Sequence, residues 1–84
     1  MPQTTQNPFE RYRRLEKAHA LVEVIDRHVS FAGLHPHNDG YAVADLLRRW
    51  TPEMWASAAV QAGKAPPSPE TIELVVETYK RRAS

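Results

Sequence analysis

The 84 residues allow one domain with a small core, and their formal net charge of +1 lacks the basic balance typical of nucleic-acid-binding domains. The absence of cysteine excludes disulfides and the usual cysteine-rich zinc sites. Because no apolar run approaches the roughly 18 residues of a membrane span and no signal segment leads the chain, we expect a soluble, cytoplasmic protein without a membrane partner.

A repeated helix-start signal indicates the fold class. A capping residue, a proline and an acid recur in Asn7-Pro8-Phe9-Glu10, Thr51-Pro52-Glu53 and Ser68-Pro69-Glu70. The capping side chain accepts amides of the first turn, and proline supplies a helical φ. The acid completes a capping box or faces the positive end of the helix dipole. We predict an all-α fold, a small bundle of about four helices over residues 8–30, 40–49, 52–62 and 69–82.

The first predicted helix carries a long apolar stripe. Residues 1–6 are polar and unpatterned, so we expect a disordered tail followed by a single helical domain over residues 7–84. Steps of three and four residues connect Leu15, Ala18, Val22, Ile25 and Val29, and Phe9, Tyr12 and Leu21 widen this stripe. We interpret the stripe as core packing, and the alternative that part of it faces a partner helix stays open.

A polar loop over residues 31–39 precedes the second helix. If this segment is extended, His35, His37 and Asp39 share a side and offer ligands to one metal ion. No matching group of ligands stands elsewhere in the sequence. We therefore favour a loop in which Asn38 or Asp39 caps the next helix, and we expect no metal and no cofactor.

Two tryptophans flank the start of the third predicted helix. Trp50 precedes the Thr51 cap, and Trp55 is the fourth residue of the helix that begins at Pro52. These are the two positions of a hydrophobic staple. We predict that the indoles pack together and fix the corner between the second and third helices. A ligand-stacking role for either indole is the alternative.

The fourth predicted helix ends in a basic segment. Gly63 ends the third helix, and the paired prolines at 66 and 67 form a stiff connector. The buried face of the fourth helix is predicted to hold Ile72, Val75, Val76 and Tyr79. Its last turn holds Lys80, Arg81 and Arg82, and the negative end of the helix dipole accounts for these cations.

The segment from residue 58 to residue 76 resembles the helix–turn–helix of LacI-type bacterial repressors. Ala-Ala-Val-Gln-Ala-Gly at 58–63 matches the A-x-x-x-A-G helix end of that family, and Thr-Ile-Glu-Leu-Val-Val at 71–76 matches its T-[IV]-x-x-V-V recognition helix. The resemblance implies that the fourth helix enters the major groove of DNA. However, the turn is longer and contains prolines, and Glu70, Glu73 and Glu77 would face a phosphate-lined groove.

The sequence contains little chemistry that points to catalysis. No serine lies in a sequence typical of an activated triad, and no glycine-rich phosphate loop is present. We predict that the protein is not an enzyme but a helical interaction module that binds a protein partner, in an adaptor or regulatory role, with self-association included.

Arginines supply the candidate partner-binding residues, because arginine is enriched at interfaces. The candidates are Arg11, Arg14, Arg48 and Arg49. The alternative is a divergent helix–turn–helix regulator that contacts nucleic acid through these arginines and Arg13.

Overall fold

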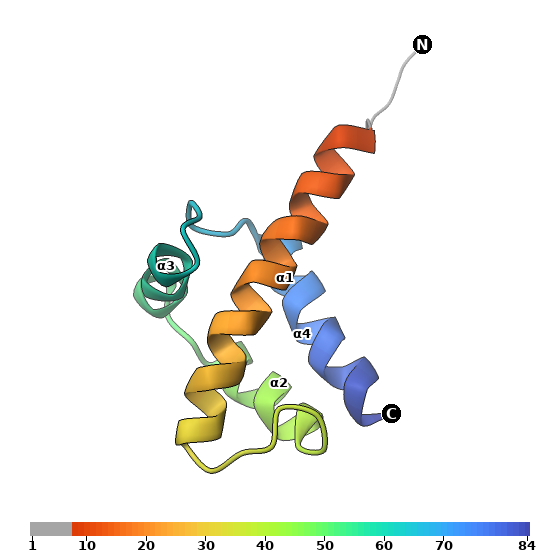
Figure 1. The fold of residues 1–84 in the computed structure, drawn as a ribbon, viewed down its shortest axis with the longest axis vertical. Coiled ribbons are helices and arrows are strands. Elements are labelled where there is room, and N and C mark those ends of the chain that lie inside the picture. Colours follow the sequence, from red (N-terminus) through yellow and green to blue (C-terminus); the bar gives the residue numbers. More distant parts are fainter. Residues whose placement is uncertain (1–7) are drawn as a thin grey trace.

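The computed structural model describes residues 8–84, and Figure 1 shows that this part of the chain folds into helices joined by short loops. The helices are α1 (Pro8–Phe31), α2 (Gly40–Arg48), α3 (Pro52–Gln61) and α4 (Pro69–Ala83). Each begins at the predicted residue and ends within one residue of the predicted end, so the prediction of a small all-α bundle is confirmed. The predicted tail over residues 1–6 and the predicted cap at position 7 lie outside the described residues.

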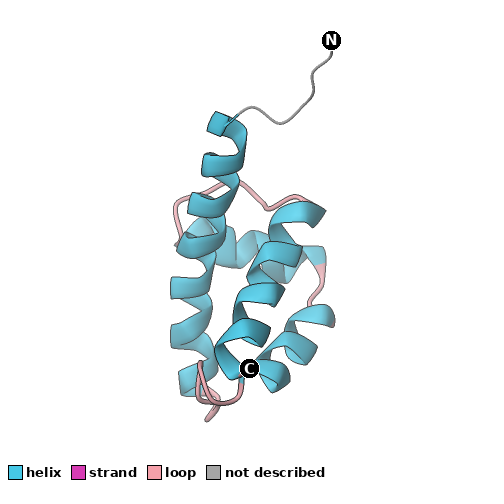
Figure 2. Ribbon diagram, turned by 90° about the vertical axis from the view of Figure 1, so that its right-hand side faces the viewer, coloured by secondary structure: helices cyan, strands magenta, loops and turns pink. Residues whose placement is uncertain are grey.

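The core lies between α4 and its two neighbours. α4 packs closely against α2 and α1, and α3 packs against α1 (Figure 2). The largest fully buried side chains are Leu21, Ile25, Val29, Val43, Leu47, Val75, Val76 and Tyr79. Each buried aliphatic side chain contributes about 1.5–3 kcal/mol relative to an exposed one. The predicted stripe of α1 is therefore core packing from Ala18 onwards.

Gly40 lets the start of α2 lie directly against the last turns of α4. A Cβ atom at this position would lie 2.0 Å from the carbonyl oxygen of Tyr79 and 3.0 Å from the Cβ of Ala83. The first distance is shorter than real Cβ atoms show to any neighbour, and the second is tighter than nine in ten Cβ contacts. The helix-to-helix distance at this point therefore requires a residue without a side chain.

A polar cluster joins α4 to α1 near this contact. The Tyr79 hydroxyl donates to Asp26 Oδ1, and Arg82 donates to the same oxygen at 3.0 Å. Arg82 also donates to the carbonyl oxygen of Pro36 at 3.2 Å. Burial, and next the hydrogen bond to Asp26, raises the pKa of Tyr79 above its ordinary value of 10.0. The helix dipole is therefore an incomplete explanation for Arg82, which an ion pair holds in place.

The helix-start signals at α3 and α4 are confirmed at the capping residues. Thr51 Oγ1 accepts from the amide of Met54 at 3.3 Å, and Ser68 Oγ accepts from the amide of Thr71 at 3.3 Å. At α3 the acid has the second of its two expected roles, because Glu53 lies in the first turn at the positive end of the helix dipole. The capping box is completed instead by Met54, whose sulfur accepts from the Thr51 amide at 3.5 Å.

The first turns of α1 extend beyond the other helices in both views (Figures 1 and 2). We call residues 8–17 the arm. Phe9, Tyr12 and Leu15 are 74%, 67% and 40% exposed, so the prediction that they belong to the core is wrong. The reason is first the side of the helix: Phe9 and Tyr12 lie five full turns before Arg27 and Ser30, which are also exposed. Length adds to this, since the 24 residues of α1 outreach the 15 residues of α4. No helix within residues 8–84 is long and apolar enough to cross a bilayer.

Candidate functional site

Two of the surfaces that combine apolar side chains with charge are candidate binding sites, and the first is a groove between α2, α3 and α4. Trp50 and Trp55 form its floor, with ring centroids 4.9 Å apart and an interplanar angle of 68°. This edge-to-face contact confirms the predicted staple. Trp55 is only 5% exposed and Trp50 is partly buried, so the pair is anchored in the bundle while it lines the groove.

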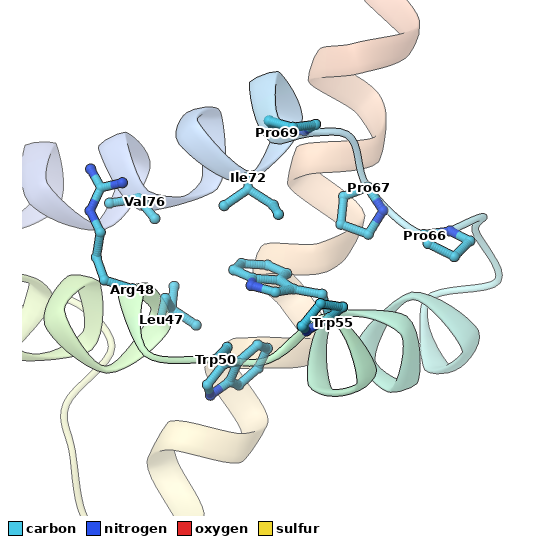
Figure 3. Close-up of a pocket in the computed structure, with 10 residues that line it drawn as sticks. Leu47, Arg48, Trp50, Trp55, Pro66, Pro67, Pro69, Ile72 and Val76 are labelled. Carbon is cyan, nitrogen blue, oxygen red and sulfur yellow. The ribbon is translucent and has the colours of Figure 1, made fainter.

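The groove has a volume of about 390 Å³. Figure 3 shows the two indoles at its centre, with Ile72 and Val76 of α4 opposite them and the connector prolines at one end. Ligand pockets usually hold about 300–1,000 Å³, so this volume suits one or two side chains of a partner. The Pro66–Pro67 segment, whose backbone is stiff, forms that end of the groove. We call this site the tryptophan groove.

Acidic side chains surround the single arginine at the rim of the tryptophan groove. Arg48 lines the groove and forms two hydrogen bonds with the Glu73 carboxylate, of which the longer is 3.2 Å. The pKa of Arg48 is raised, first by its hydrogen bond to Glu73 and then by the negative charges of Glu73, Glu77 and Asp45. The same pairing with Arg48 lowers the pKa of Glu73. Lys80 lies close enough to Glu73 to lower its pKa as well, so three carboxylates face two cations at this edge of the groove.

The arm is the second surface, and its charge is opposite. Phe9, Tyr12 and Leu15 follow one another at steps of three residues and form an exposed ridge. Arg13 lies four residues after Phe9, and Arg11 lies four residues before Leu15, so a guanidinium flanks the ridge on either side. Across residues 8–17 there are four cations and two carboxylates, a net charge of +2.

The structure distributes the predicted binding arginines over both surfaces without bringing them into contact. Arg11 and Arg14 lie on the arm, and neither forms an ion pair with another described residue. Arg48 lies at the groove, where Glu73 engages it. Arg49 follows as the C-cap of α2 and is exposed. Arg11 is exposed and therefore available to a partner, whereas Arg14 is half-buried beside Ser68 and Thr71. Arg48 already holds α2 to α4.

The helices of the repressor-like segment do not pack as a close pair. α3 and α4 would be the two helices of that motif, but the closely packed pairs are α2 with α4, α1 with α4 and α1 with α3. Glu70, Glu73 and Glu77 are exposed on α4, as expected from the sequence. The surface that the motif would offer to DNA is therefore acidic.

The histidine loop has a local structural role. His35 Nδ1 accepts from the amides of His37 and Asn38 at 3.1 and 3.0 Å, and Asp39 Oδ2 accepts from the His35 amide at 2.7 Å. Asp39 occupies the N-cap position of α2, but its side chain makes no cap hydrogen bond, which corrects that prediction. Among the described residues, no group of three or more His, Cys, Asp or Glu side chains is placed to hold a metal ion.

Comparison with known proteins identifies no family and no relative for this chain. No family model, curated protein or solved structure matches the chain. Any functional conclusion therefore depends on the two surfaces themselves.

The negative rim and the Asp26 cluster were not predicted from sequence. One signal for the cluster was present: Asp26 follows Val22 by four residues, so it continues the buried face of α1 with a carboxylate that needs a partner. The sequence places Glu73 only on the solvent side of the fourth helix, and nothing in it predicts an ion pair with Arg48. That pairing depends on how α2 crosses α4.

Proposed function

We propose that this protein is a non-enzymatic helical interaction module that binds a protein partner, in an adaptor or regulatory role. The observation that carries the proposal is the arm. Phe9 and Tyr12 are mostly exposed although aromatic side chains of this size usually contribute to a core or an interface. Arg11 and Arg14 beside them make no ion pair with other described residues. Aromatic and arginine side chains together are the residue types enriched at interface centres.

The cytoplasm is the proposed compartment. A chain without cysteine makes no use of the disulfides that an oxidising compartment allows. Nucleic acid is the less supported partner, because α4 presents exposed acids and does not pack closely on α3. The helix–turn–helix alternative stays a prediction from sequence.

Capture from a native lysate with and without nuclease tests this proposal. The full chain is immobilised beside the arm variant Phe9→Ser/Tyr12→Ser. The matched control is Phe31→Ser/Val60→Ser, which removes one aromatic and one aliphatic side chain that are exposed outside the arm. We expect a protein that is retained after nuclease treatment by the wild type and the control and lost with the arm variant.

Two results would contradict the proposal. The DNA-binding alternative would be favoured if the captured material is lost after nuclease treatment and is also lost with Arg48→Glu/Arg49→Glu. Equal capture by the wild type and the arm variant would remove the arm from any binding role.

A further inference from the structure

The arm and the tryptophan groove are complementary in two independent respects. The arm presents an exposed aromatic ridge, and the groove presents an apolar concavity that no described residue fills. The arm has a net charge of +2, and next to the groove Asp45, Glu73 and Glu77 surround its lining residue Arg48, with Lys80 near Glu73, so that carboxylates outnumber cations at this edge. A convex basic surface and an apolar groove with a mainly acidic edge match each other, but a continuous helix cannot fold its own arm back into the groove.

We propose that the tryptophan groove receives the arm of a second copy of this chain, with Phe9 and Tyr12 entering the groove and Arg11 and Arg13 facing its acidic rim. The inference rests on the proposed function, because it names the partner that the arm binds.

The area available to this contact indicates a reciprocal dimer. Aromatic side chains bury about 150–250 Å² each, so Phe9 and Tyr12 cover about 300–500 Å². With a similar area from the groove, one arm-to-groove contact buries about 600–1,000 Å², whereas stable interfaces bury about 1,200–2,000 Å². Two contacts related by a twofold axis reach that range, and a closed twofold dimer is the commonest assembly of identical chains. The two copies therefore exchange arms.

Sedimentation velocity on the full chain between about 1 µM and 1 mM tests the inference, since dimers in this size class span the micromolar range. We expect a monomer–dimer equilibrium that weakens as the salt concentration rises, because the ion pairs form at the rim. Phe9→Ser/Tyr12→Ser should abolish dimerisation, and Phe31→Ser/Val60→Ser should leave it unchanged. Every substituted side chain is exposed, and helical content is measured for each variant to establish that it folds.

Paired charge reversals provide the decisive measurement. Arg11→Glu/Arg13→Glu makes the arm acidic, and Asp45→Lys/Glu77→Lys makes the rim basic. In a dimer of either variant alone, arm and rim carry charges of the same sign at both contacts. We therefore expect the self-association of each variant to weaken at least about tenfold, which corresponds to about 1.4 kcal/mol. In an equimolar mixture both contacts again join opposite charges, so the heterodimer should form with nearly wild-type affinity.

The outcomes separate this inference from the proposed function. A wild type that stays monomeric at 1 mM, or a mixture of the two reversed variants that stays monomeric, overturns the arm exchange. If the arm nevertheless retains a protein from lysate, the interaction function stands and only the identity of the partner is wrong. If the arm variant neither dissociates a dimer nor loses a captured protein, both proposals fail.

Discussion

The two halves of α1 share one helical pattern and have opposite surroundings. Residues 18–31 bury six side chains in the bundle, whereas no residue of the arm is fully buried. Apolar side chains recur at helical spacing through both halves. Phe9 and Tyr12, however, lie on the side of the helix that Arg27 and Ser30 expose further along. Periodicity therefore indicates a helix with a wide apolar face, and the packing of the neighbouring helices decides which part of that face is covered.

The charged side chains differ between the two regions in the same way. In the bundle, Arg82 binds Asp26 and Arg48 binds Glu73, and each pair joins two helices. On the arm, Arg11 and Arg13 form no ion pair with another described residue. The same residue type thus holds the fold together in one region and is available to a partner in the other.

The largest expected effect comes from the closest helix contact in the bundle. Gly40→Ala would place a carbon 2.0 Å from the Tyr79 carbonyl oxygen, and a backbone atom cannot rotate away as a side chain can. We expect a loss of about 4 kcal/mol or more in the free energy of unfolding, at the upper end of overpacking effects. Urea denaturation followed by circular dichroism measures this loss.

Gly63→Ala is the matched control for Gly40→Ala. No atom lies within 4 Å of the added carbon, but Gly63 has a φ of +70°, so the substitution costs only the backbone strain of about 1–2 kcal/mol. Equal losses in the two variants would show that α2 does not lie against α4 as closely as described.

A pair of identical substitutions on α1 compares the two regions directly. Leu21 is fully buried and Leu15 is 40% exposed. We expect Leu21→Ala to lower the free energy of unfolding by about 2–5 kcal/mol, the range for buried leucines. Leu15→Ala should cost less than about 1 kcal/mol, since alanine is the better helix former and little burial is lost.

Protein concentration sharpens this comparison. At about 1 µM the arm of a weak dimer is mostly unpaired, and the difference between the two leucine variants should be greatest. If Leu15→Ala is as destabilising as Leu21→Ala even at that concentration, the arm is packed within the monomer and the contrast between the regions is wrong.

The fold was largely predictable because its signals are local. Thr51 and Ser68 cap their helices through hydrogen bonds to residues three positions away, and Trp50 meets Trp55 across a single turn. Such contacts depend on spacing in the sequence, which is visible without a structure. For the same reason, all predicted helix starts within the described residues agree with the structure.

The candidate site was less predictable because it depends on contacts between distant segments. Residue type alone predicts the binding residues Arg11, Arg14, Arg48 and Arg49. Only the packing of α2 on α4 separates Arg48 from the arm arginines. The groove exists because the Pro66–Pro67 connector and α4 face the tryptophan pair, and no local pattern encodes that approach. The exposure of Phe9 depends on which side of α1 packs on the bundle, since Phe9 lies on the same side of the helix as the exposed Arg27.

The smallest predicted effect is a pH dependence confined to the bundle. Because the pKa of Tyr79 is raised in the folded protein by burial and then by Asp26, its contribution to stability is complete below the unfolded value near 10.0 and is lost as the pH rises above it. Each pH unit above that value removes about 1.4 kcal/mol. Between pH 8 and about pH 11, the melting temperature should therefore fall less steeply with pH for Tyr79→Phe than for the wild type. Tyr12→Phe alters an exposed tyrosine of the arm and should retain the wild-type slope. Parallel slopes for Tyr79→Phe and the wild type would mean that the Tyr79 hydroxyl is not enclosed between α1 and α4.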